Sequence, residues 1–325
     1  MTLVETARGP VDAGSLGVTL MHEHVFILNE EVRENYPAEY PDGWDEDDQV
    51  DGAITKLTEL AGRGCQTIVD PTVVGLGRDI HRIRRVADGT QLNIIVATGL
   101  YTYNDVPFYF TYRVPGLPGT GRADPMTELF VRDIQTGIAG TGIKAAFLKC
   151  AVDEPGLTPG VERVLRAVCR AHAETGAPIT VHTHPRSGTG RDVVRVLREE
   201  GADLTKVVLG HSGDTTDLDY LTELADAGCL LGMDRFGLDI ITPFEDRVTT
   251  VASMCERGYA ERMVLSHDAA CYIDWFPPAV VPQFAPSWNY QHLFADVLPA
   301  LRDRGVSDEQ IDTMLVANPR RYFGG

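Results

Sequence analysis

A regular alternation of short apolar runs and helical segments is the feature that most constrains the fold of this chain. Eight of the runs are too short to be helices and fit buried strands. The strands are expected at residues 20–25, 67–71, 92–98, 145–149, 178–182, 207–211, 229–234 and 263–268. Segments with helical spacing of apolar residues separate them, at 50–63, 79–88, 124–139, 161–175, 190–200, 218–227 and 245–257.

Repeated βα units imply a parallel sheet with right-handed crossovers, and eight such units close into a (β/α)8 barrel, the TIM barrel. We expect an α/β fold in which residues 1–325 form a single domain, although length alone also allows two domains. An open, doubly wound sheet is the alternative. No G-x-G-x-x-G or P-loop motif follows any of the strands, which disfavours nucleotide binding.

Composition narrows the class of protein further. The 325 residues are 43% hydrophobic, which allows a large core, and they carry a formal charge of −18. This charge argues against nucleic acid and anionic membrane partners, because both require a basic surface. No signal peptide or membrane-spanning stretch is recognisable, so a cytoplasmic protein is expected. The six cysteines form no C-x-x-C pair and are expected to be reduced core thiols.

Three long segments interrupt the alternation. They cover residues 29–49, 101–123 and 269–287, and each follows a predicted strand, at the end of the barrel where enzymes of this fold place their sites. The first of them is strongly acidic, and we expect residues 30–51 to form a solvated loop.

Metal-capable or ionisable side chains stand at the carboxyl ends of several predicted strands. His22 and His24 are two residues apart, so on an extended strand both imidazoles point to the same face and make half of a metal site. Each histidine alone is more typical of a hydrogen-bonded core or loop residue than of a metal ligand, but a barrel brings all strand ends to one cavity, which favours the metal site. The residues at these ends are His22, His24, Lys149, His182, His211 and Asp268.

Lys149 is unusual in this set, because an ammonium group repels metal ions and has no lone pair to donate. One interpretation is a lysine paired with an acid and unconnected to any metal. The other is that burial favours its neutral amine, which captures carbon dioxide to form a carbamate that acts as a bridging carboxylate. We adopt the second hypothesis because of the position of Lys149 at a strand end.

The order of these residues resembles the binuclear phosphotriesterase branch of the amidohydrolase superfamily, and longer motifs resemble its phosphotriesterase-like lactonases along nearly the whole chain. The motifs are Met21-His22-Glu23-His24, Ala97-Thr98-Gly99-Leu100-Tyr101, Asp153-Glu154-Pro155-Gly156, Gly210-His211-Ser212-Gly213-Asp214-Thr215, Asp234-Arg235-Phe236-Gly237 and Ser266-His267-Asp268. The resemblance implies a homodimer and two divalent metal ions.

The resemblance also implies how the ligands are shared. His22, His24 and Asp268 would bind one ion, His182 and His211 the other, and N6-carboxylated Lys149 would bridge the two together with a hydroxide. Zinc is the expected metal, and cobalt, manganese and iron also accept this ligand set. The family pattern leaves His184 and His267 outside the ligand set, as loop or structural residues.

Further roles follow from matched positions. Tyr101 would contact the carbonyl of a lactone substrate, and Asp268 would carry a proton from the nucleophile to the leaving alkoxide. Arg235 would orient loops or the leaving group, with a structural salt bridge as the alternative. An apolar channel for an acyl chain would include Leu238, Trp275 and Phe276, although aromatic loop residues also serve in packing.

The resemblance therefore predicts a metal-dependent hydrolase acting on small molecules. The expected activity is hydrolysis of lactones, N-acyl homoserine lactones in particular, which would make the enzyme quorum-quenching, with weak hydrolysis of organophosphate triesters. A phosphotriesterase (aryldialkylphosphatase) proper is the alternative, because it would share all six ligand positions. A barrel that binds small ligands without turnover is a second alternative.

Overall fold

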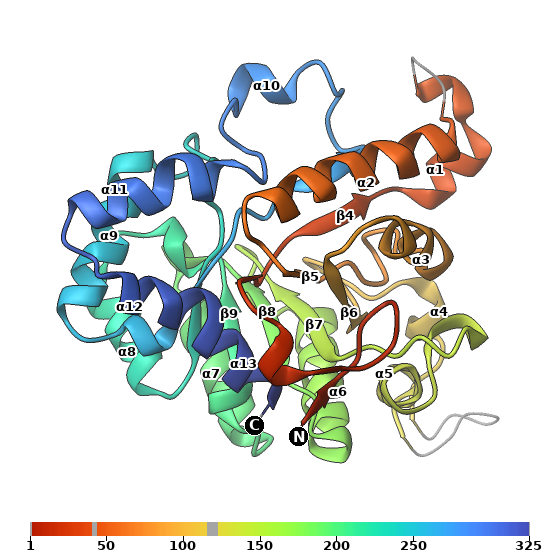
Figure 1. Ribbon diagram of the computed structural model, residues 1–325. Helices are drawn as coiled ribbons and strands as arrows, with labels where there is room; N and C mark the ends of the chain where they lie inside the picture. Colours follow the sequence, from red (N-terminus) through yellow and green to blue (C-terminus); the bar gives the residue numbers. More distant parts are fainter. Residues whose placement is uncertain (1, 41–43, 116–122, 325) are drawn as a thin grey trace.

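The computed structural model describes residues 2–40, 44–115 and 123–324, and these form a nearly closed barrel of eight parallel strands surrounded by helices (Figure 1). The predicted TIM barrel is confirmed. Around the barrel the strands are β3 (Thr19–Leu20), β5 (Thr67–Asp70), β6 (Asn93–Gly99), β7 (Phe147–Val152), β8 (Ile179–Thr183), β9 (Val207–Gly210), β10 (Leu230–Met233) and β11 (Met263–Leu265).

Helices cover the outside of the barrel, and most of them lie where periodicity predicted. Those that follow the strands are α2 (Glu46–Gly62), α3 (Ile80–Gly89), α5 (Pro125–Gln135), α6 (Pro159–Thr175), α7 (Thr189–Glu199), α8 (Leu218–Asp226) and α9 (Phe244–Glu256). The C-terminal part adds α11 (Leu298–Asp303), α12 (Asp308–Asp312) and α13 (Asn318–Gly324), with π-helical turns at Leu293–Val297 and Thr313–Ala317.

Local chemistry sets the helix boundaries. The carboxylates of Asp45, Asp79 and Asp124 accept hydrogen bonds from first-turn amides and so cap α2, α3 and α5. Helix α5 stops at Gln135, earlier than predicted, because Gly137 has a φ of 122° and breaks the helical path. The third long segment carries α10 (Val281–Phe284), and the second carries α4 (Phe108–Thr111), with residues 116–122 outside the described part.

The first predicted strand is not continuous, which corrects the expectation for residues 20–25. Strand β3 pairs with β5, whereas β4 (His24–Ile27) leaves the barrel and pairs with β12 (Ala270–Ile273) in a separate two-stranded ribbon. Between them the backbone amide of His22 donates to Ser266 Oγ (2.9 Å). The chain switches partners here because a side chain takes the place of a strand neighbour.

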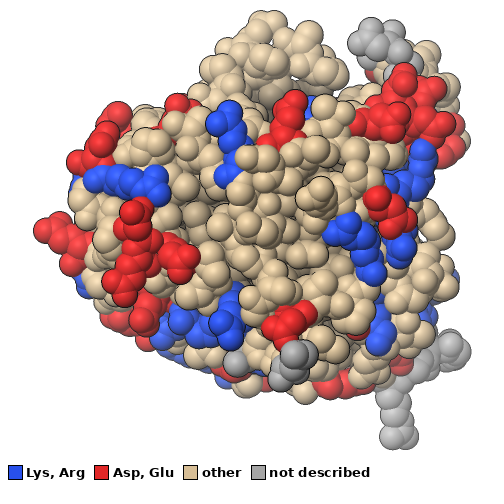
Figure 2. Space-filling view, in the orientation of Figure 1, with Lys and Arg blue, Asp and Glu red and all other residues tan. Residues whose placement is uncertain are grey.

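The acidic segment is also not the solvated loop that composition predicted. Residues Glu30–Asn35 form α1, and the later acids start α2; residues 41–43 lie outside the described part. The reason is Arg82, which is 1% exposed and donates to Glu30 Oε1 (2.9 Å) and Glu46 Oε2 (3.1 Å). Figure 2 shows acidic side chains gathered over this part of the surface.

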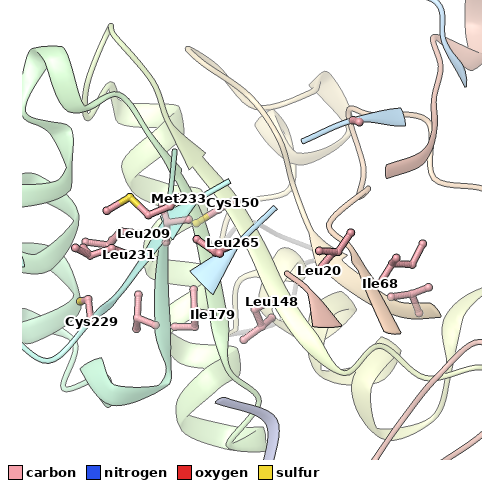
Figure 3. Packing of buried hydrophobic residues seen from close by; sticks show 14 of the residues in the cluster. Leu20, Ile68, Leu148, Cys150, Ile179, Leu209, Cys229, Leu231, Met233 and Leu265 are labelled. Carbon is pink, nitrogen blue, oxygen red and sulfur yellow. The ribbon is translucent and has the colours of Figure 1, made fainter. Parts of the chain in front are cut away.

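The largest hydrophobic cluster fills the space between the strands and the surrounding helices. Strand residues such as Leu148, Cys150, Leu209 and Leu231 face this layer (Figure 3). Because strand side chains alternate, Lys149 points the other way, into the barrel. All six cysteines are buried and free, as predicted.

A smaller cluster fills the interior of the barrel. Phe147 and Val264 pack there with Tyr322 of α13, whose hydroxyl lies 2.9 Å from Thr180 Oγ1. Helix α13 and strand β1 (Leu3–Val4), which pairs with β2 (Val11–Asp12), close this end of the barrel (Figure 1). The site must therefore lie at the opposite end. No helix within the described residues is long and apolar enough to cross a bilayer.

Candidate active site

One pocket at the carboxyl ends of the strands contains every residue that the sequence nominated for the site. Its polar floor and its apolar wall belong to the same cavity. The nominated lining residues are His22, His24, Tyr101, Lys149, His182, His211, Arg235, Leu238, Asp268, Trp275 and Phe276.

Three of the expected ligands converge on one point. The Nε2 atoms of His22 and His24 lie 3.2 and 3.3 Å from Asp268 Oδ1. These atoms are close enough together to hold one metal ion, and all three residues are buried or nearly so. Although burial alone would raise the pKa of Asp268, the neighbouring Arg235 guanidinium helps to hold it well below its usual range.

The opposite ring nitrogens of two histidines meet at Asp234. Its carboxylate lies 3.1 Å from Nδ1 of His22 and 3.0 Å from Nδ1 of His211, and it also accepts from the backbone amide of His211. These three groups could hold a metal themselves, but hydrogen bonding already occupies both Nδ1 atoms. Burial lowers the pKa of His22 and His211, so both rings are neutral. Asp234 therefore turns their Nε2 lone pairs toward the pocket.

Other partners orient His24, again through Nδ1, and His182, through Nε2 instead. His24 Nδ1 lies 2.7 Å from Thr72 Oγ1, and that hydroxyl donates to Asp70 Oδ1 (2.5 Å). His182 Nε2 is hydrogen-bonded to Asp153, and burial lowers the pKa of His182 to about 4. Each of the four expected histidine ligands thus has a hydrogen-bond partner behind it.

These partners were not singled out from the sequence, although one signal was present. Asp234 closes a predicted strand just as His211 and Asp268 do, and the same reasoning could have included it. Thr72 and Asp153 lie in loops after strands β5 and β7, and only the fold brings them to their histidines.

Lys149 lies at the bottom of the pocket. Its side chain is 1% exposed, and its Nζ atom has no hydrogen-bond partner within the described residues. Burial lowers the pKa of Lys149 to about 8. Gly99, with a φ of 149°, allows strand β6 to approach this lysine, because a Cβ atom there would lie 1.8 Å from the Lys149 carbonyl oxygen.

Arg235 is both a pocket residue and part of an ion-pair network. Its Nε atom donates to Asp268 Oδ2 (2.9 Å), and Nη1 donates to Asp214 Oδ2 (2.9 Å). Asp214 also pairs with the buried Arg247 (2.7 Å). The salt bridge that was the alternative role for Arg235 therefore exists, and one of its partners is the predicted proton carrier.

Tyr101 stands over the polar floor. Its hydroxyl lies 3.2 Å from His182 Nδ1 and 2.5 Å from the hydroxyl of Tyr103. Burial raises the pKa of Tyr101 well above its usual value and that of Tyr103 to about 12, so both phenols keep their protons at neutral pH. Tyr103 was not singled out from the sequence.

The wall of the pocket is apolar. Leu238 is buried, Trp275 is 50% exposed at the rim, and Phe276 lies beside them. The sequence did not nominate the other apolar lining residues, which are Ile27, Leu76, Ile240, Ile241, Ile273, Phe284 and Trp288.

The two histidines left out of the ligand set lie outside the pocket. His184 Nδ1 is 2.7 Å from Ser187 Oγ in the loop after β8. His267 is fully buried, and its Nε2 accepts from the amide of Leu293 (2.9 Å).

An eight-stranded barrel whose carboxyl end carries neutral histidines, an ionised aspartate and a buried lysine has the architecture of a metal-dependent hydrolase. The sequence profile described as the phosphotriesterase family matches residues 2–323, and the chain belongs to that family.

Known relatives agree with this assignment. A solved structure described as the phosphotriesterase from Mycobacterium tuberculosis is 62% identical, with a TM-score of 0.95 over 99% of this chain and 98% of its own. An aryldialkylphosphatase from Saccharolobus solfataricus is 39% identical over 99% of this chain and 100% of its own. A mutant of a PTE-like lactonase from Deinococcus radiodurans is 33% identical, with a TM-score of 0.89 over 99% of this chain and 100% of its own.

Proposed function

We propose that this chain is a binuclear metal-dependent lactonase that hydrolyses N-acyl homoserine lactones and hydrolyses phosphotriesters only slowly. The observation that carries the proposal is the single pocket in which a polar floor of nitrogen and oxygen ligands meets an apolar wall. A lactone ring needs the first and an acyl chain needs the second. The likeness to a PTE-like lactonase supports this choice.

The floor brings the ligand atoms of His22, His24 and Asp268 close enough together for one divalent ion, and we propose a second ion beside it. His22, His24 and Asp268 would hold one ion and His182 and His211 the other. Lys149, whose buried Nζ lacks a partner in the described part of the chain, would serve both as a carbamate. Leaving that amine buried and unpaired costs several kcal/mol. Bound there, zinc or another divalent metal would activate water at neutral pH and polarise the attacked carbonyl.

The other residues follow from their positions. The protonated Tyr101 hydroxyl would donate a hydrogen bond to the lactone carbonyl. Asp268, held ionised beside the Arg235 guanidinium, would take a proton and deliver it to the alkoxide released on ring opening. Arg235 would keep the Asp268 carboxylate in place through the Nε to Oδ2 hydrogen bond. Leu238, Trp275 and Phe276 would contact the acyl chain.

The test is a comparison of kcat/KM for N-acyl homoserine lactones, simple γ- and δ-lactones and a phosphotriester, on protein reconstituted with metal and bicarbonate. We expect lactone rates well above triester rates, and loss of both with a chelator. Triester dominance would instead favour a phosphotriesterase proper, the activity in the name of the Saccharolobus solfataricus relative. Turnover of neither substrate class by metal-loaded protein would favour the ligand-binding barrel.

Two further measurements test separate parts of the proposal. A mass or crystallographic analysis of metal-loaded protein should show carboxylated Lys149, and an unmodified amine would contradict the bridge. Replacement of Trp275 by alanine should raise KM for long acyl chains more than for simple lactones. Val280→Ala, which changes another exposed apolar residue of the same segment but not the pocket lining, is its control.

A further inference from the structure

Glu23, which lies between His22 and His24, is fully buried and does not line the pocket. Its Oε1 atom accepts hydrogen bonds from Ser266 Oγ (3.0 Å), from the backbone amide of His267 (2.9 Å) and from His267 Nδ1 (2.6 Å). Its Oε2 atom accepts from the amide of Ala269 (3.1 Å). Every one of these partners donates, so Glu23 acts only as a hydrogen-bond acceptor.

The tautomer of His267 is fixed by this arrangement. Its Nε2 accepts the amide proton of Leu293, so the ring proton must sit on Nδ1 and point at Glu23. The carbonyl oxygen of His267 in turn accepts from Trp288 Nε1 (2.9 Å), and Trp288 lines the pocket. The contacts of Glu23 therefore reach from the floor of the site to its apolar wall.

All the groups that Glu23 holds belong to residues 266–269, which surround Asp268. The two chain segments are also joined directly, because the amide of Asp268 donates to the His22 carbonyl (3.0 Å) and that of His24 to the Ala269 carbonyl (2.8 Å). Asp268 has a φ of 56°, a strained conformation for a residue other than glycine that persists only when its surroundings enforce it. The bonds to Glu23 on both sides of Asp268 supply that enforcement.

We infer that Glu23 is a positioning residue for one half of the metal centre. It fixes His22, His24 and Asp268 relative to one another. Among the described residues it makes no hydrogen bond to His182, His211 or Lys149. This inference rests on the proposed two-metal function, and it assigns the site of His22, His24 and Asp268 a dependence on Glu23 that the other site lacks.

The decisive variant is Glu23→Gln, which keeps the shape of the side chain. Its amide oxygen can still accept, but its NH2 group must then face the amide proton of Ala269. We expect bound metal, measured by mass spectrometry of the dialysed protein, to fall from two ions per chain toward one. Affinity at the affected site should drop about 10- to 100-fold, the usual effect of removing a group that orients metal ligands.

A second readout needs no metal. In the metal-free protein, amides of residues 263–273 should exchange hydrogen faster in Glu23→Gln than in the wild type, because the amides of His267 and Ala269 lose the carboxylate that holds this segment. Ser266→Ala removes one of the four donors, so it should change both readouts in the same direction by less. It also keeps the test decisive if Glu23→Gln fails to fold.

Asp124→Asn is the matched control. Asp124 is a 5% exposed carboxylate that caps α5 and pairs with Arg163 (2.8 Å), away from the pocket. The Asp124→Asn variant should have a lower thermal stability, but it should still bind two metal ions, and hydrogen exchange of the amides of residues 263–273 should be unchanged. Equal loss of both metals in Glu23→Gln, wild-type affinity in that variant, or the same metal loss in Asp124→Asn would overturn the inference. A wild-type protein that never binds two metals would contradict the proposed function instead, and the exchange comparison would still decide the role of Glu23.

Discussion

Two of the proposed metal ligands differ from nearly all other non-glycine residues in their backbone conformation. His211 and Asp268 have φ values of 63° and 56°, and Ala139 is the only other non-glycine residue in the described part with positive φ. Such conformations are uncommon and concentrate at functional sites. His211 directly follows strand β9 and Asp268 lies three residues after strand β11, and both side chains line the pocket.

Replacement of Asp268 by asparagine should test its role as proton carrier. Asparagine tolerates the positive φ, so we expect the fold to be retained and lactone kcat/KM to fall about 10²- to 10⁴-fold. Steady-state kinetics with metal content measured on the same sample is the check. Asp239→Asn removes an exposed carboxylate nearby without touching the pocket and should have little effect. Near-normal turnover of metal-loaded Asp268→Asn would exclude Asp268 from the mechanism.

The proposed ligands could be identified from the sequence because each is a polar residue that closes an apolar run. Of their hydrogen-bond partners, only Asp234 also closes a predicted strand. Thr72 and Asp153 could not be identified, because they act on histidines of other strands and those pairings depend on how neighbouring strands are aligned. The four donors around Glu23 were hidden for the same reason.

A single buried arginine side chain holds together the two helices of the acidic segment. Arg82 of α3 joins α1 and α2 through Glu30 and Glu46, and its guanidinium lies 5.5 Å from the ring centre of Phe26 and 5.4 Å from that of Trp44. Phe26 belongs to β4, two residues beyond His24. The segment is therefore packed against the strand that leads out of the site.

We expect Arg82→Leu to lower the free energy of unfolding by about 2 kcal/mol, since it leaves carboxylates without their charged hydrogen-bond donor. Chemical denaturation followed by circular dichroism would measure the change. Arg85→Leu is the control on the same helix, because Arg85 is 43% exposed and its pairs with Glu46 and Asp47 contribute little. Equal destabilisation by the two variants would contradict a special role for Arg82.

Periodicity predicted correctly the helices and strands that are held in place mainly by hydrophobic packing. Helices α6, α7 and α8 and strands β5 to β10 fall within a few residues of their predicted ranges for this reason. Helix α1 was missed because Glu30 at its start pairs with an arginine that lies some fifty positions further along the chain. The break between β3 and β4 was missed because Ser266 creates it.

Buried thiols affect the stability of the whole molecule. Burial raises the pKa of Cys65, Cys169, Cys229 and Cys271 to about 12. A thiol in the unfolded chain ionises near pH 8.5, whereas the buried thiol of the folded chain keeps its proton. The free energy of unfolding therefore falls by up to about 1.4 kcal/mol per thiol for each pH unit above 8.5.

We therefore expect Tm to be level between pH 7 and 8 and to fall steeply from about pH 9, as measured by thermal unfolding in a reducing buffer. Cys229→Ala removes one of these thiols and should make the decline shallower. Parallel profiles for the variant and the wild type would show that other groups cause the alkaline loss.

We propose that the protein forms the homodimer that the family resemblance implies. Helix α4 and the residue after it expose two stacked rings, because Phe108 is 77% and Tyr112 is 71% exposed. We expect light scattering to give twice the chain mass of 35.6 kDa. The double variant Phe108→Ser/Tyr112→Ser should shift the protein toward the monomer if this patch lies in the interface. A monomeric wild type would refute the dimer.

Backbone pairing between the eight strands does not close the barrel completely. Strands β3 and β11 stand at the two edges of the sheet, and in the described structure no ladder of backbone hydrogen bonds joins them. The gap is closed by His22, Glu23, Ser266 and Asp268 and by the β4–β12 ribbon. The proposed catalytic centre is thus also the place where the barrel is held closed. A substitution that makes this region more mobile and so raises the turnover rate also weakens the closure of the barrel. Variants of this enzyme selected for faster turnover will therefore lose stability during storage unless other substitutions strengthen the barrel elsewhere.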